Sequence, residues 1–169
     1  DGAITFLENH DEERSLKSLG FERSRAAAVM GSTLPGMHLF FDGQFSGARH
    51  RVPVQLALPA QENRCVCTLS QDGPGCHCQE VFYERLLRSL EHPAFKGEWQ
   101  KIEAGQYQIY ASLWSHGNEQ CLVCTNYSDE ITHVVLPCMF TVWRDLLNDV
   151  DQPDYVSQEG DQIKINLPP

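Results

Sequence analysis

The sequence lacks any apolar run approaching the roughly 20 residues that a transmembrane helix needs, so we expect no membrane span. It is also poor in basic residues: 13 Lys and Arg stand against 23 Asp and Glu, which gives a formal net charge of −10. Nucleic acids and anionic membranes are polyanions, so this charge disfavours both as partners. Neutral polysaccharide is compatible with it.

The composition is that of a globular protein, with 41% hydrophobic and 21% charged residues. The seven cysteines are an odd number and do not settle the redox compartment. Cys121 and Cys124 lie in an apolar run, where free cysteine behaves as a small buried hydrophobe. We therefore favour a reducing, cytoplasmic compartment.

The chain opens with a short apolar run, residues 4–7, that changes abruptly into polar residues. This pattern predicts a buried strand. Asn9, His10 and Asp11 follow at its carboxyl end, where parallel α/β folds keep their ligand crevices. The local pattern thus indicates a site at the start of the chain.

A helix and a second strand follow the first one. Residues 21–33 have a helical apolar period, which Pro35 and Gly36 end, and residues 37–41 are again apolar. Strand, helix and strand over about forty residues predict a βαβ unit with parallel strands. Residues 42–63 read as a loop, with a basic cluster at Arg49, His50 and Arg51, and residues 80–91 read as a further helix.

Beyond a predicted connector at 94–105, the apolar period changes from 3.6 to 2. Six short strands are expected, at 107–114, 119–126, 131–136, 140–147, 155–158 and 162–167. Short strands separated by turns predict an antiparallel sandwich. Tyr110 and Trp114 project from one face of its first strand, where they could stack on sugar rings or pack within the protein.

The residues Phe6-Leu7-Glu8-Asn9-His10-Asp11 resemble the motif that ends the seventh barrel strand in the α-amylase family of glycoside hydrolases. The following helix, the strand at 37–41 and Gly43-Gln44 fit the same resemblance. It implies that Asp11 stabilises the transition state and that His10 contacts sugar hydroxyls. It also makes Asn9, Arg14 and Gln44 candidates for substrate binding, with Gln44 facing the cleft.

The resemblance implies an α/β plus all-β fold. Residues 1–104 would be the C-terminal part of a (β/α)8 TIM barrel, contributing its last two strand-helix units, with a Cys-rich insert at 64–79. Residues 105–169 would form the β-sandwich that follows the barrel. A complete barrel takes roughly 250 residues, so we expect the N-terminal remainder of the barrel to precede this chain.

The implied activity is cleavage or transfer of α-glucosidic bonds with retention, acting on α-glucans or malto-oligosaccharides. Retaining enzymes need a nucleophile and a general acid about 5–5.5 Å apart. In the family both come from earlier strands, so we expect this chain alone to be inactive. Without the resemblance, Asp11 could be a helix cap or loop acceptor, His10 a core histidine, and Arg14 a member of an ion pair.

Two C-x-C pairs form a possible metal site outside the family pattern. Cys65, Cys67, Cys76 and Cys78 could bind zinc, with His77 as an alternative ligand. Disulfides or unpaired thiols are the other interpretations. This leaves a second functional class open: a non-catalytic module that binds carbohydrate or zinc. No other cofactor is implied.

Overall fold

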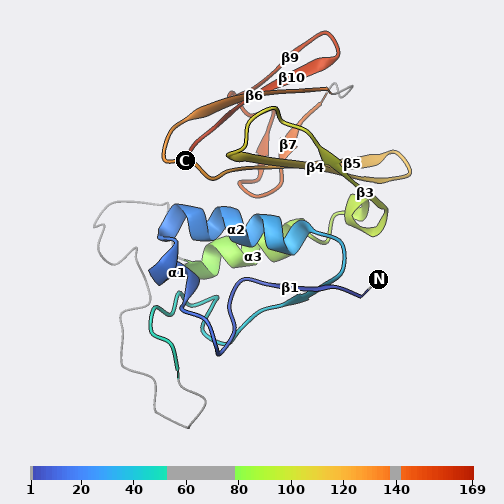
Figure 1. Cartoon of the computed structure of the whole chain (residues 1–169). Coiled ribbons are helices and arrows are strands. Elements are labelled where there is room, and N and C mark those ends of the chain that lie inside the picture. Colours follow the sequence, from blue (N-terminus) through green and yellow to red (C-terminus); the bar gives the residue numbers. More distant parts are fainter. Residues whose placement is uncertain (1, 53–78, 138–141) are drawn as a thin grey trace. The chain divides into compact units, whose positions relative to one another are not determined.

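The computed structural model describes residues 2–52, 79–137 and 142–169, and its chain divides into two compact units, residues 1–87 and 88–169 (Figure 1). Each unit has its own sheet or sheets. The four cysteines of the predicted zinc site lie outside the described residues. Among the described residues, no helix is long and apolar enough to cross a membrane.

The first unit contains the predicted strand-helix-strand element. Strand β1 (Ile4–Phe6) pairs in parallel with β2 (Met37–Leu39), and helices α1 (Ser15–Ser18) and α2 (Phe21–Thr33) lie between them in sequence. Helix α2 ends at Thr33, and Leu34 after it has the extended backbone that a following proline favours. The parallel pairing predicted from the sequence is confirmed.

The two faces of this strand pair differ. On the helix side, the Thr5 hydroxyl donates to the Gly31 carbonyl of α2 at 3.0 Å. On the other side, four large apolar side chains are 44–66% exposed: Ile4, Phe6, Met37 and Leu39. The sequence predicts buried strands, but this face of β1 and β2 is exposed in the part of the chain that the structure describes. No third strand pairs with either edge there.

Helix α3 (Gln79–Ser89) supplies the aromatic core of the first unit. Tyr83 is 1% exposed, and its ring lies 4.7 Å from that of Phe45 and 6.2 Å from that of Phe40 (centroid distances). Both phenylalanines follow β2 in the chain. The core therefore fixes the segment that follows β2, one of the two loops at the site.

The second unit is an antiparallel sandwich, as predicted. One sheet has the order β3 (Glu98–Ile102), β4 (Ile109–His116), β5 (Glu119–Asn126). The other has the order β6 (Thr132–Pro137), β10 (Gln162–Leu167), β9 (Val156–Glu159). Strands β7 (Arg144–Asp145) and β8 (Val150–Asp151) form a further short pair. The core between the sheets consists of Ile109, Ala111, Val134, Leu136, Ile163 and Ile165.

Three details of the second unit differ from the sequence prediction. The predicted connector at 94–105 overlaps the 3-10 helix η2 (Pro93–Lys96) and contains strand β3. The compact units divide after residue 87. The predicted strand at 140–147 is reduced to β7 within its described part. Trp114 is 8% exposed, and its ring centroid lies 5.7 Å from that of Phe95, which favours packing over sugar stacking.

Candidate functional site

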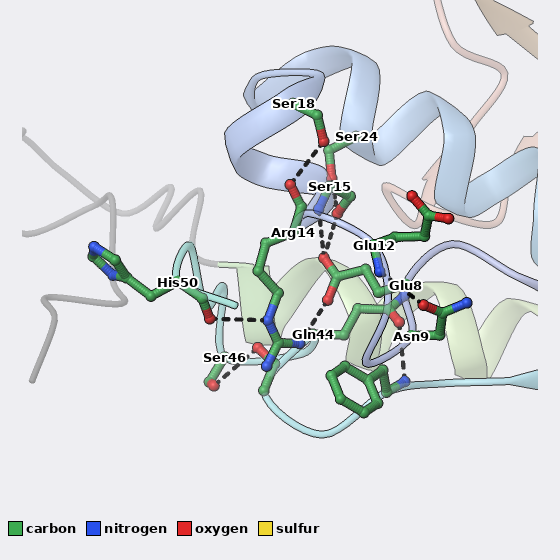
Figure 2. A network of polar contacts seen from close by, with 12 residues as sticks. Glu8, Asn9, Glu12, Arg14, Ser15, Ser18, Ser24, Gln44, Ser46 and His50 are labelled. Carbon is green, nitrogen blue, oxygen red and sulfur yellow. Dashed lines mark hydrogen bonds and ion pairs between the residues drawn. The ribbon is translucent and has the colours of Figure 1, made fainter. Parts of the chain in front are cut away.

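The loop after β1 is closed at its base by one buried carboxylate. Glu8 is 2% exposed, and its Oε2 accepts from Nη1 of Arg14 at 2.9 Å (Figure 2). Its Oε1 accepts from the backbone N–H and the hydroxyl of Ser15, at 2.9 and 2.6 Å. Glu8 therefore holds the two ends of the segment 8–15 together.

Arg14 connects this closure to the segment after β2. Its side chain is 3% exposed, its Nε donates to the His50 carbonyl at 3.3 Å, and its Cζ lies 4.6 Å from the Phe41 ring centroid. A Cβ on Gly43 would approach Nη2 of Arg14 to 3.2 Å, so the absence of a side chain there leaves room for the guanidinium. The ion-pair interpretation of Arg14 is the one that this geometry favours.

The tip of the loop carries the polar pair singled out by the sequence. Oδ1 of Asn9 accepts from the backbone N–H groups of Asp11 and Glu12, at 2.8 and 2.9 Å, which fixes a tight turn. His10 Nε2 and Asp11 Oδ2 are 3.3 Å apart, and the two side chains are 56% and 69% exposed. The loop thus presents a carboxylate and an imidazole to solvent from a backbone held by hydrogen bonds.

Gln44 lies inside the first unit. It is 3% exposed, its amide donates to the Tyr83 hydroxyl at 2.8 Å, and its Oε1 accepts from the Phe41 N–H at 3.2 Å. Burial raises the pKa of Tyr83 to about 12, so its phenol is neutral at physiological pH. The prediction that Gln44 faces a cleft is therefore corrected: its polar atoms hold the turn after β2.

The structure separates the five predicted substrate-site residues into two groups. Asn9, His10 and Asp11 form the tip, where His10 and Asp11 are exposed and Asn9 is half-buried, whereas Arg14 and Gln44 are buried with protein partners. The sequence analysis missed Arg51, which donates from Nε to the carbonyl of His10 at 3.0 Å. Its membership of the basic cluster at 49–51 was the available signal.

The described residues offer no group of three or more His, Cys, Asp or Glu side chains that could hold a metal ion. The chemistry available at the tip is that of an exposed carboxylate beside an imidazole, on a main chain held by hydrogen bonds. A carboxylate in such a place suits stabilisation of a cationic transition state.

The sequence matches no family model, and no curated protein matches it significantly. Solved structures do match its fold. A maltogenic α-amylase from Thermotoga neapolitana matches with a TM-score of 0.69 and 23% identity, over 98% of this chain and 39% of that one. An α-amylase from H. orenii matches with a TM-score of 0.71 and 20% identity, over 98% and 38%. This chain has the fold of part of an α-amylase.

The same α-amylase-like fold extends to an enzyme with a different substrate. Trehalose-6-phosphate hydrolase from Bacillus licheniformis matches with a TM-score of 0.64 and 17% identity, over 96% of this chain and 42% of that one. The chain thus spans about two fifths of the length of these enzymes. At such identities the likeness concerns the fold, and it agrees with the family resemblance of residues 6–11.

Proposed function

We propose that this chain is the C-terminal portion of a retaining glycoside hydrolase of the α-amylase type, acting on α-glucans or malto-oligosaccharides. The observation that carries the proposal is the exposed His10–Asp11 tip at the carboxyl end of a parallel strand. Ligand sites of parallel α/β folds lie at this end of their strands. The fold shared with α-amylases supports the same assignment.

Asp11 is assigned as the transition-state stabiliser. When a glycosidic bond breaks, the sugar ring acquires oxocarbenium character, and a nearby carboxylate lowers the energy of that charge. The Asn9 side chain holds the Asp11 backbone N–H, so the carboxylate starts from a fixed main chain. His10, beside it, is assigned to hydrogen bonds with the sugar hydroxyls.

Arg14 and Gln44 are assigned to positioning and not to substrate contact. Their side chains are each 3% exposed, and both bind groups of the protein itself. Arg14 holds the loop after β1 through Glu8, and Gln44 holds the turn after β2 through Tyr83. Both loops therefore have internal supports next to the tip.

The open face of the β1–β2 pair supports a larger barrel. Strands of parallel sheets are normally covered on both faces, whereas Ile4, Phe6, Met37 and Leu39 are exposed here. We propose that further parallel strands of the same protein cover this face and supply the nucleophile and the general acid. The 169 residues by themselves are then expected to be inactive.

The test is the substitution Asp11→Asn in the full-length protein, assayed with maltohexaose. We expect kcat to fall roughly 1,000-fold with a smaller change in KM, because a transition-state charge is lost. Asp161→Asn, in the turn before β10, is the matched control and should leave kcat unchanged. Full activity of Asp11→Asn, or hydrolysis by the 169 residues alone, would contradict the proposal. The product distribution separates hydrolysis from glucanosyl transfer.

A further inference from the structure

We propose that Arg51 is a positioning residue for the His10–Asp11 tip, an inference that rests on the proposed function for its catalytic consequence. Arg51 lies 40 residues beyond Asp11, in the loop after β2, and its side chain is exposed. Its Nε donates to the carbonyl of His10 at 3.0 Å. That carbonyl belongs to the peptide group that joins His10 to Asp11.

Two hydrogen bonds, one in each direction, connect the loop after β1 with the loop after β2. Arg14, from the loop after β1, donates to the carbonyl of His50, in the loop after β2 (Figure 2). Arg51, the residue next to His50, donates back to the carbonyl of His10. Each loop thus contributes one guanidinium and accepts one at its main chain. Neither loop can shift without disturbing both bonds.

The two hydrogen bonds hold different parts of the loop after β1: Arg14 holds its base and Arg51 holds its tip. Arg14 is buried, and Glu8 and the Phe41 ring fix its guanidinium, so it anchors the base of the segment 8–15. Arg51 reaches the tip itself. On the other side of the tip, the Asn9 side chain holds the N–H groups of Asp11 and Glu12. The peptide group between His10 and Asp11 is therefore held through its carbonyl by Arg51 and through its N–H by Asn9.

Removal of the Arg51 bond frees one side of that peptide group. The carboxylate of Asp11 then samples a wider range of positions, although its charge is unchanged. Displacements of about 1 Å at a catalytic group can cost about 100-fold in rate. Loss of the Arg51 hydrogen bond is not expected to unfold the protein, because this bond is exposed and the buried Glu8–Arg14 pair stays intact.

The first experiment measures amide hydrogen exchange in the full-length protein, on peptides that cover residues 8–15. Arg51→Ala is expected to accelerate exchange in this segment, and Arg51→Lys, which keeps the charge and a donor, to restore part of the protection. Lys164→Ala removes one exposed positive charge from β10 and serves as the control. Unchanged exchange in Arg51→Ala, or equal acceleration in Lys164→Ala, would overturn the inference whatever the protein catalyses.

The second experiment asks whether Arg51 acts through Asp11. With maltohexaose, Arg51→Ala should lower kcat about 10-fold with little change in KM or melting temperature, and should add almost nothing in an Asp11→Asn background. Equal losses in both backgrounds would contradict positioning through Asp11. An Asp11→Asn variant with normal activity would instead refute the proposed function, and the exchange data would still decide whether Arg51 holds the tip.

Discussion

The Arg14 guanidinium and the Glu8 carboxylate form an ion pair of 2.9 Å, with 3% and 2% of their side chains exposed. Each charge has further polar partners: Ser15 for Glu8 and the His50 carbonyl for Arg14. A buried charge left without its partner is costly, because it retains the desolvation penalty and loses the compensating attraction. This pair therefore makes the loop after β1 sensitive to the loss of either member.

Glu8→Gln should reduce the free energy of unfolding of the first unit by about 3–5 kcal/mol, the usual cost of breaking a buried pair. Urea denaturation measures this change. Glu13→Gln is the matched control, since Glu13 pairs with Lys17 on the surface, where both side chains are about half exposed. The control should change stability little, because exposed ion pairs contribute little. Equal effects of the two substitutions would show that burial does not govern the Glu8 pair.

Gly36→Ala should destabilise the β1–β2 pair. Gly36 has a φ of +129°, and a Cβ there would lie 2.7 Å from the carbonyl oxygen of Ala3. That oxygen also accepts from the N–H of Met37 at 3.0 Å, so it cannot move away freely. We expect a loss of about 1–3 kcal/mol, measured by thermal unfolding.

Gly31→Ala in helix α2 is the opposite case, since a Cβ there meets nothing within 4 Å. Alanine is the better helix former, so this control should raise stability by about 0.5–1 kcal/mol. A destabilised Gly31→Ala together with a neutral Gly36→Ala would contradict this local packing.

The first unit should lose stability on acidification through His38. Burial lowers the pKa of His38, and its Nδ1 lies 2.7 Å from the Thr5 hydroxyl. The unfolded chain then binds a proton more readily than the folded one, so stability is highest above the unfolded pKa of about 6.5 and falls as pH drops below it. Urea midpoints at pH 8 and pH 5 should differ less in His38→Gln than in the unsubstituted protein. If the midpoints at pH 8 and pH 5 differ as much in His38→Gln as in the unsubstituted protein, His38 is not the source of the acid sensitivity.

Cys121 should resist thiol reagents in the folded protein. It is a free cysteine on β5, and burial raises the pKa of its thiol to about 11. At pH 8 only about one molecule in a thousand would carry the reactive thiolate. Iodoacetamide labelling followed by peptide mapping should show slow modification of Cys121 in buffer and fast modification in 8 M urea. Fast labelling in buffer would show that the thiol is more accessible than its burial indicates.

The sequence predicted the elements whose apolar period is regular. Strands at 119–126 and 162–167 have the predicted bounds, and the parallel pair follows from two apolar runs separated by a helix. Strand β3 was missed, because its outward residues Glu98, Gln100 and Lys101 are polar and exposed. This edge strand pairs with β4, and pairing across sequence distance is not visible in local periodicity.

At the site, the sequence singled out the tip and gave an ion pair as one interpretation of Arg14, but it did not indicate the burial of Gln44. The motif drew attention to Asn9, His10 and Asp11, which the structure places together in one turn. The burial of Arg14 and Gln44 depends on partners 36 and 39 positions away in the chain. Contacts of that kind arise from tertiary packing, so residue type and spacing alone did not show that these two side chains are buried.

The exposed pairs Ile4–Met37 and Phe6–Leu39 should limit the solubility of these 169 residues on their own. Exposed apolar side chains beside unpaired strand edges promote self-association of the chain. Concentrated preparations should therefore turn cloudy, and mild detergent should clear them. The double substitution Ile4→Lys and Met37→Glu should keep the protein in solution, because it places charge on this exposed apolar face.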